Sequence, residues 1–178
     1  MLCVGFRPLV LESERLLFRP GRPEDAQRLT ALLDWEVLKY FDFIHYPYDQ
    51  AAAERYLERV AENHTGSEPG LFMLEERGRG LLIGEAWVLR REGTEDFALG
   101  YWLGAPFQGK GYGKETVGRL IAYGRDELGV TALHANVAPQ NKRSSELLKG
   151  FGFKPNGREE RPESRAGNSY VERWLLEL

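Results

Sequence analysis

Phe97-Ala-Leu-Gly-Tyr-Trp-Leu103 forms a strand-like run that leads into the glycine-rich turn Gln108-Gly-Lys-Gly-Tyr-Gly113. An amphipathic helix pattern follows, from Tyr112 to Leu128. A glycine-rich turn that enters a helix presents several backbone N–H groups to one point, where the helix dipole also favours negative charge. The pattern therefore predicts a strand, a turn and a helix that together can hold a diphosphate.

The spacing of the glycines separates this turn from two common phosphate-binding motifs. Neither Ser nor Thr follows Lys114, so the turn is not the phosphate loop of nucleoside triphosphatases. The glycines fall at 109, 111 and 113, which is not the spacing of the dinucleotide-binding motif. By itself, the turn also fits a tight connection that binds no ligand.

Length and composition set ordinary bounds. The chain has 178 residues, a net charge of -3 and 42% hydrophobic residues, which predicts one domain (residues 1–178) with a sizeable core. This charge gives no electrostatic argument for nucleic acid or an anionic membrane as the main partner. The one cysteine, Cys3, cannot form an internal disulfide, and no apolar stretch approaches the roughly 20 residues that span a bilayer. The chain start is too poorly patterned for a signal peptide, so a cytoplasmic location is expected.

Hydrophobic periodicity and turn residues predict a mixed α/β (α+β) domain. The expected strands are Leu9–Arg19, Leu71–Glu75, Leu81–Arg90, Thr94–Leu103, Thr131–Val137 and two more from Phe153 onward. The expected helices begin near Pro23, Gln50, Tyr112 and Lys142, and they end near Leu33, Asn63, Leu128 and Lys149. Short glycine-containing connections between the middle strands indicate antiparallel hairpins.

An aromatic segment, Trp35 to Tyr48, lies between the first two expected helices. Such a segment most often packs as core or as a lid over a pocket. A substrate-contact surface is the alternative.

A second motif, Asn141-Lys-Arg-Ser-Ser-Glu-Leu-Leu-Lys-Gly-Phe-Gly-Phe153, follows the strand that ends at Val137. Lys110 and Lys114 flank the glycine turn, and Lys142-Arg143 begins the second motif. Charge-assisted contacts from lysine to phosphate are strong and suit a ligand that carries several phosphates. The alternative is that these charges form solvated surface.

The two motifs together resemble the GNAT superfamily of acyl-CoA-dependent N-acyltransferases, and most of all its ribosomal-protein N-terminal acetyltransferase (RimJ/RimL-like) branch. The similarity extends over nearly the whole chain and includes Ser13-Glu-Arg-Leu16, Arg19-Pro20, Trp35-Glu-Val-Leu-Lys-Tyr40, Ile83-Gly84 and Gly100-Tyr-Trp-Leu103. The resemblance implies a mostly antiparallel, seven-stranded sheet with about four helices. It also implies that the sheet splays open between the strands that end at Leu103 and Val137.

The resemblance further implies acetyl-CoA as the co-substrate and no metal. The pantetheine arm would bond like an extra strand to the backbone in the splay, because a parted strand edge presents N–H and C=O groups that need partners. Glycine in the turn lets the chain approach the diphosphate without a Cβ in the way. The predicted cofactor-binding residues are Tyr101, Trp102, Leu103, Gln108, Gly109, Lys110, Gly111, Tyr112, Gly113, Lys114 and Asn141. Asn141 is also a candidate helix N-cap.

The chain departs from the family at two catalytic positions. Some GNAT enzymes carry a glutamate base five residues before the motif asparagine and a tyrosine acid seven residues after it; here these positions are Asn136 and Leu148. Neither side chain can exchange a proton at neutral pH, so that mechanism does not transfer. The resemblance instead places Ser144 near the leaving thiolate. The alternative for Ser144 is a first-turn serine that bonds a backbone group, and Ser145 is the second candidate.

A general base is harder to assign. Glu85 is the candidate, because it lies in the otherwise apolar run Leu81–Val88, where burial raises a carboxyl pKa towards neutrality. A cross-strand ion pair is the alternative for this carboxylate. His134 can titrate, but a histidine in a strand is more often structural. Asp42 and His45, in the aromatic segment, are candidates for recognising the incoming amine.

The predicted function is therefore transfer of an acetyl group from acetyl-CoA to a primary amine in a ternary complex. Cys3 lies too close to the chain terminus to supply a nucleophile for a covalent intermediate. The acceptor is left open among a protein N-terminus, a small amine and an antibiotic amine. A homodimer is also left open, and no nucleic acid or membrane partner is expected. The rival classes are a catalytically silent acyl-CoA-binding module and, less favoured, a nucleotide-binding protein.

Overall fold

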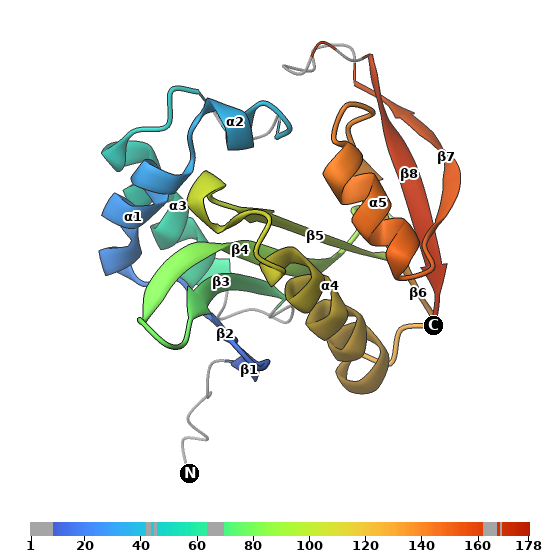
Figure 1. The fold of residues 1–178 in the computed structure, drawn as a ribbon, viewed down its shortest axis with the longest axis horizontal. Helices are drawn as coiled ribbons and strands as arrows, with labels where there is room; N and C mark the ends of the chain where they lie inside the picture. Colours follow the sequence, from blue (N-terminus) through green and yellow to red (C-terminus); the bar gives the residue numbers. More distant parts are fainter. Residues whose placement is uncertain (1–8, 42–43, 45, 64–69, 162–166, 168) are drawn as a thin grey trace.

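The structure is a computed structural model that describes residues 9–41, 44, 46–63, 70–161, 167 and 169–178. Its strands are β1 (Leu11–Glu12), β2 (Leu16–Arg19), β3 (Leu71–Glu76), β4 (Leu81–Arg90), β5 (Phe97–Leu103), β6 (Ala132–Val137), β7 (Lys154–Glu160) and β8 (Tyr170–Glu177). They form one sheet with the order β1-β2-β3-β4-β5-β6-β8-β7 (Figure 1). Cys3, Asp42 and His45 lie outside the described residues.

The α-helices are α1 (Ala26–Leu32), α2 (Trp35–Leu38), α3 (Gln50–Asn63), α4 (Tyr112–Ala122) and α5 (Lys142–Gly150). The 3-10 helices η1 (Pro23–Asp25) and η2 (Ala105–Phe107) precede α1 and the glycine turn, and a π-helical turn, η3 (Tyr123–Glu127), continues α4. No helix in the described part of the chain is long and apolar enough to cross a membrane.

The sheet has eight strands rather than the predicted seven, because the first predicted strand, Leu9–Arg19, is a hairpin. Ser13 closes the hairpin turn. Its backbone N–H donates to the Leu16 carbonyl (2.9 Å), and its hydroxyl accepts a hydrogen bond from the Leu16 N–H (3.3 Å). β1 and β2 therefore pair antiparallel, with Leu11 opposite Phe18. Local serine bonds compete with a continuous extended strand, and apolar alternation alone does not reveal them.

The described part of the chain also has five α-helices where about four were predicted. The additional helix, α2, is a single turn at the start of the aromatic segment. Asp34 caps it by accepting a hydrogen bond from the Val37 N–H (3.1 Å). Asp49 caps α3 in the same way through the Ala52 N–H (2.7 Å).

The predicted splay lies between β5 and β6, which are parallel neighbours. Their register pairs only Phe97 with Leu133 and Ala98 with His134, at the N-terminal end of the contact. Beyond these pairs, β5 stays bonded to β4 and β6 stays bonded to β8, but the two strands no longer meet each other. The mixed sheet therefore opens towards the C-terminal ends of β5 and β6.

The helices cover both faces of the sheet. Side chains alternate across β5, so Tyr101 and Trp102 point to opposite faces. On the Tyr101 face lies α4, where a Cβ added to Gly113 would lie 3.4 Å from the tyrosine ring. Figure 1 shows α4 and α5 beside each other on the near side of the sheet. On the Trp102 face lies α3, whose Tyr56 bonds Glu85, the β4 residue opposite Trp102.

The apolar face of α4 fixes the helix to the sheet. Val117 and Leu120 are fully buried there, and Tyr123 packs edge-on against Phe72 of β3, with ring centroids 5.6 Å apart. Burial of each such side chain is worth roughly 1.5–3 kcal/mol. The start of α4, and with it the glycine turn, is therefore held in a fixed place relative to β5.

Candidate functional site

A cavity of about 720 Å³ lies between the glycine turn, the start of α5 and α2. This volume is in the range of small-molecule sites. Nine of the eleven residues predicted to bind the cofactor line it, namely Tyr101, Trp102, Leu103, Gln108, Gly109, Gly111, Gly113, Lys114 and Asn141. Lys110 and Tyr112 belong to the same turn but do not line the cavity. We call it the larger cavity.

The backbone conformation requires glycine at two positions of the turn. Gly109 (φ +73°) and Gly111 (φ +85°) adopt left-handed backbone conformations, which strain any residue with a Cβ. Gly113 has no such φ, and a Cβ there would make ordinary van der Waals contact with the Tyr101 ring (3.4 Å) and Leu147 (3.5 Å). Gly111 is also the N-cap of α4, so the N–H groups of the next three residues have no acceptor within the helix. The turn thus presents free donors at the positive end of the α4 dipole.

Basic side chains line the larger cavity beside this turn. Lys114 comes from the first turn of α4, and Lys142 and Arg143 come from the first turn of α5. A further lysine, Lys39 of the α2 region, is paired with Glu36 at 2.6 Å. Donors and cations therefore converge from two helix N-termini, an arrangement that suits a ligand with several phosphate groups.

Gln108 links the turn to both neighbouring elements. Its side-chain amide donates to the carbonyl of Leu103 (2.9 Å), at the end of β5. Its carbonyl oxygen accepts a hydrogen bond from Arg143 Nη1 (3.1 Å), at the start of α5. Gln108 therefore fixes the spacing between the strand end and the helix that face each other across the larger cavity.

A second cavity of about 230 Å³ lies in the splay itself. We call it the smaller cavity. The residues that line it come mainly from β5 and β6, and they include Ala98, Leu99, Gly100, Ala135, Asn136, Val137, Leu148 and Val171. Tyr40, Phe41, Tyr101, Asn141 and Ser144 line both cavities. The two cavities therefore adjoin at these five residues.

Asn141 and Ser145 stabilise the start of α5. The Asn141 side chain accepts a hydrogen bond from the Ser144 N–H (3.3 Å), which is the predicted N-cap. Ser145 is buried, lines neither cavity, and donates from its hydroxyl to the Asn141 carbonyl (3.1 Å). Of the two candidate serines, only Ser144 faces the place where the cavities adjoin.

Ser144 has a tyrosine neighbour there. Burial raises the pKa of the Tyr101 phenol, and a side-chain hydrogen bond with Ser144 opposes this rise. At neutral pH the phenol is therefore protonated. Tyr101 and Ser144 thus place two neutral hydroxyl groups where the larger and the smaller cavity adjoin.

Glu85, the predicted base, lies beneath the site and lines neither cavity. Its side chain is buried, and it accepts a hydrogen bond from the Tyr56 hydroxyl (2.8 Å). Burial raises the pKa of Glu85 to about 7, and the Tyr56 hydrogen bond lowers it only in part. The alternative, a cross-strand ion pair, has no partner for Glu85 among the described residues. The role of Glu85 as base stays a prediction.

The positions at which the chain departs from the resemblance both line the smaller cavity. Asn136 donates to Glu159 of β7 (3.2 Å), and Leu148 is buried in the core. His134 lines neither cavity; burial and the nearby Arg91 lower its pKa, and it lies 3.5 Å from Asp96. Among the described residues that line the cavities, Glu36 is the one carboxylate and histidine is absent.

The sequence did not identify every residue of the site. Val37 and Lys39 line the larger cavity, and Tyr40 and Phe41 line both cavities, because α2 folds over the end of β5. The high aromatic content of this segment is the signal, and it agrees with the expectation of a lid over a pocket. In the part of the chain that the structure describes, no group of three or more His, Cys, Asp or Glu residues is placed to hold a metal ion.

The chain is similar in sequence to known proteins. The family described as Acetyltransferase (GNAT) domain matches residues 15–154. The chain is 39% identical over 158 residues to ribosomal protein uS5-alanine N-acetyltransferase of Escherichia coli, with 83% of this chain and 79% of that protein covered. It is 28% identical over 151 residues to N-acetyltransferase p20 of Bacillus licheniformis, an uncharacterized protein, with 83% of each covered.

Solved structures show the same fold at lower identity. The ribosomal-protein-S5-alanine acetyltransferase of Vibrio fischeri superposes with a TM-score of 0.78 at 17% identity, covering 95% of this chain and 96% of that one. RimL, a ribosomal L7/L12 α-N-protein acetyltransferase solved with coenzyme A, has a TM-score of 0.79 at 15% identity, covering 96% of this chain and 98% of that one. The open mixed sheet with helices on both faces is therefore the fold of these proteins.

Proposed function

Because the chain belongs to the GNAT acetyltransferase family, we propose that it transfers an acetyl group from acetyl-CoA directly to the amine of a protein N-terminus. One observation carries this proposal: two cavities adjoin at Ser144 and Tyr101. The larger cavity takes the cofactor, and the smaller cavity takes the amine. The two substrates then meet at the neutral hydroxyl pair.

The larger cavity suits acetyl-CoA in two respects. The start of α4 offers free N–H groups, and Lys114, Lys142 and Arg143 lie beside them. These groups can bind the diphosphate and the third phosphate of acetyl-CoA. The backbone of Tyr101, Trp102 and Leu103 has no partner strand on its β6 side, so it can bond the pantetheine arm. This arm leads from the glycine turn towards Ser144.

The reaction needs little more than positioning. The neutral amine nitrogen attacks the thioester carbonyl carbon and forms the C–N bond; the C–S bond breaks and sulfur leaves as a thiolate. Ser144 donates a hydrogen bond to that thiolate, and Tyr101 orients the serine hydroxyl through its own hydrogen bond. The new amide nitrogen loses its extra proton to water, and the thiolate gains one. Holding the two substrates in place can supply much of the rate.

Direct transfer is favoured over a covalent enzyme intermediate. No cysteine is among the described residues that line either cavity. Initial-velocity measurements with both substrates varied are therefore expected to give intersecting lines, as a ternary complex requires. Parallel lines would indicate a covalent acetyl-enzyme instead.

The choice of a protein N-terminus rests on the relatives. The Escherichia coli relative at 39% identity and the RimL structure are both named for acetylation of ribosomal proteins. A small amine or an antibiotic amine is the alternative acceptor, and a cytoplasmic location goes with either. Acetyl-CoA turnover on a panel of N-terminal peptides, polyamines, amino acids and aminoglycosides tests the choice. The peptides are expected to have the highest kcat/KM.

A catalytically silent acyl-CoA-binding module is the competing function, since Asn136 and Leu148 stand where some relatives carry a base and an acid. It predicts tight CoA binding and no turnover on any member of the panel. Turnover that depends on Ser144 contradicts the silent module.

A further inference from the structure

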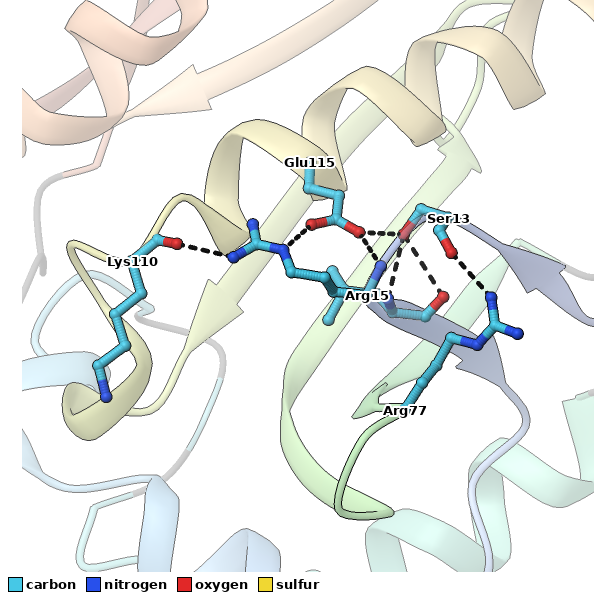
Figure 2. Close-up of polar contacts among 6 residues, drawn as sticks. Ser13, Arg15, Arg77, Lys110 and Glu115 are labelled. Carbon is cyan, nitrogen blue, oxygen red and sulfur yellow. Dashed lines mark hydrogen bonds and ion pairs between the residues drawn. The ribbon is translucent and has the colours of Figure 1, made fainter.

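Glu115 lies in the first turn of α4, next to the proposed diphosphate site, but its carboxylate points away from that site. Figure 2 shows it directed at the hairpin turn between β1 and β2. It accepts hydrogen bonds from the Ser13 hydroxyl (2.7 Å), the Arg15 backbone N–H (2.6 Å) and Arg15 Nε (2.7 Å). Burial acts to raise the pKa of Glu115, but these hydrogen bonds and the Arg15 charge hold it below its usual value. The carboxylate is therefore ionised at neutral pH.

Arg15 connects this carboxylate to the glycine turn. While Nε bonds Glu115, Nη1 donates to the backbone carbonyl of Lys110 (3.0 Å), as Figure 2 shows. The guanidinium also stacks 4.5 Å above the ring centre of Tyr112, and a Cβ on Gly111 would lie 3.3 Å from its Nη2. This side chain thus contacts Lys110 and Tyr112 and lies beside Gly111 between them.

The hydrogen bond from Arg15 to the Lys110 carbonyl sets the direction in which the Gly111 N–H points. The Lys110 carbonyl and the Gly111 N–H belong to one trans peptide plane, so they point in opposite directions. Because Arg15 holds the carbonyl, the Gly111 N–H points away from Arg15, and Gly111 lines the larger cavity. Two residues that do not line the cavity, Arg15 and Lys110, therefore orient a group that does.

The ion pair with Arg15 also compensates the negative charge of Glu115 near the proposed diphosphate site. A carboxylate in the first turn of a helix is favoured by the helix dipole, but it repels an anion bound at the same helix end. Arg15 neutralises Glu115 across the turn, with N–O contact at 2.7 Å. The helix start can therefore keep an acidic residue and still hold a diphosphate.

The hairpin that carries Arg15 is itself fixed. Arg77, in the turn after β3, donates from Nη1 to the Ser13 carbonyl (3.0 Å) and from its backbone N–H to the Arg15 carbonyl (2.9 Å). Arg119, one turn further along α4 than Glu115, donates to the Glu12 carbonyl (3.1 Å). The first hairpin is therefore bonded to α4 at two places.

We propose that Arg15 and Glu115 are positioning residues for the diphosphate of acetyl-CoA: Glu115 holds Arg15, and Arg15 aims the backbone of the glycine turn and cancels the carboxylate charge. This inference rests on the CoA-dependent function proposed above. It assigns a role in cofactor binding to a segment about a hundred residues away from the turn in the sequence.

The test compares Arg15→Ala with the double variant Arg15→Ala/Glu115→Gln. Removal of Arg15 leaves the negative charge of Glu115 without its cation in the helix turn next to the diphosphate, so the dissociation constant of CoA, measured by calorimetry, is expected to rise about tenfold. Removal of the carboxylate as well is expected to restore affinity to within about threefold of the parent. Arg15→Lys keeps the charge but cannot bond Glu115 and the Lys110 carbonyl at the same time. Its CoA affinity is expected to lie between those of Arg15→Ala and the double variant. Arg125→Ala, which breaks an exposed pair with Asp126, is the matched control.

Steady-state kinetics give a second measurement, which would not change in this way if Arg15 had only a structural role. Arg15→Ala is expected to raise KM for acetyl-CoA about tenfold with kcat within about twofold, as the loss of uniform binding predicts. With S-acetylpantetheine, which has no diphosphate, kcat/KM is expected to change less than about twofold. Equal losses on both thioesters would overturn the proposal. A double variant that binds CoA no better than Arg15→Ala would overturn the charge-cancelling role of Arg15. CoA binding needs no turnover, so rescue without acetylation of any amine would contradict the proposed function and leave this inference standing.

Discussion

The larger and the smaller cavity adjoin at Ser144, yet the chain builds them in different ways. The larger cavity rests on backbone geometry: two glycines with positive φ and the free N–H groups at the start of α4. The smaller cavity rests on side chains from strands that lie far apart in the sequence, such as Leu99, Val137 and Val171. A backbone site keeps its shape when surface residues change, whereas a side-chain site changes with each substitution. The cofactor half is therefore expected to be insensitive to changes that alter the acceptor half.

Ser144, one of the five residues that line both cavities, gives the largest expected effect. Ser144→Ala removes the donor to the leaving thiolate and is expected to lower kcat about 100-fold. KM for acetyl-CoA is expected to stay within about threefold of the parent, because the diphosphate and pantetheine contacts remain. Steady-state kinetics with both substrates varied measure this.

Ser145→Ala is the matched control for that change. Its hydroxyl bonds the Asn141 carbonyl and faces neither cavity, so it is expected to cost stability but less than about threefold in kcat. An equal fall in kcat for the two serine variants would contradict the assignment of Ser144.

The cofactor half is tested next by Gly109→Ala. The left-handed backbone at Gly109 costs about 1–2 kcal/mol with a Cβ present, and the strain is expected to distort the turn. The dissociation constant of CoA is expected to rise about tenfold, while KM for the acceptor peptide changes little. Gly129→Ala is the control: Gly129 has a similar φ of +67° and, like Gly109, has nothing within 4 Å of an added Cβ. It is expected to lower Tm similarly and to leave CoA binding unchanged.

The acceptor half is tested by Ala138→Leu. Ala138 is buried and lines only the smaller cavity, so the larger side chain fills space that the amine needs. We expect kcat/KM for the peptide to fall about fivefold, with CoA affinity unchanged. Ala122→Leu at the end of α4 lines neither cavity and is the control. Loss of CoA affinity in Ala138→Leu would show that the halves are not separable.

Glu85 gives the smallest expected effect on catalysis, because it lines neither cavity. We expect Glu85→Gln to change kcat less than about threefold, and a fall of 100-fold or more would support Glu85 as the general base. Its effect on stability is distinct. The pKa of about 7 lies above the ordinary value of 4.5, so between these values the folded state keeps a proton that the unfolded chain has lost.

The free energy of unfolding is therefore expected to fall as pH rises from 5 to 8, by up to about 3 kcal/mol from this group. Glu85→Gln is expected to flatten that dependence in urea titrations. Glu95→Gln, at an exposed carboxylate, is expected to keep it. An unchanged slope in Glu85→Gln would contradict the buried, proton-binding state of this carboxyl.

The same contrast explains how much the sequence predicted. Gly109, Gly111 and Asn141 act through local backbone geometry, so their spacing was enough to locate the turn and the α5 cap. Ser13 turns the first predicted strand into a hairpin through side-chain bonds that hydrophobic alternation does not register. The smaller cavity depends on the register between β5 and β6, and the bond between Arg15 and Glu115 joins residues 100 apart. Such contacts depend on tertiary packing, so no local sequence pattern predicts them.

A bisubstrate conjugate, in which the sulfur of CoA is joined through an acetyl linker to the N-terminus of a short peptide, tests the central claim most directly. A crystal structure of its complex is predicted to place the CoA diphosphate on Gln108–Gly113, the sulfur within hydrogen-bonding distance of Ser144 Oγ, and the peptide in the smaller cavity. A peptide that leaves through the larger cavity, or a sulfur that lies away from Ser144, would contradict the account.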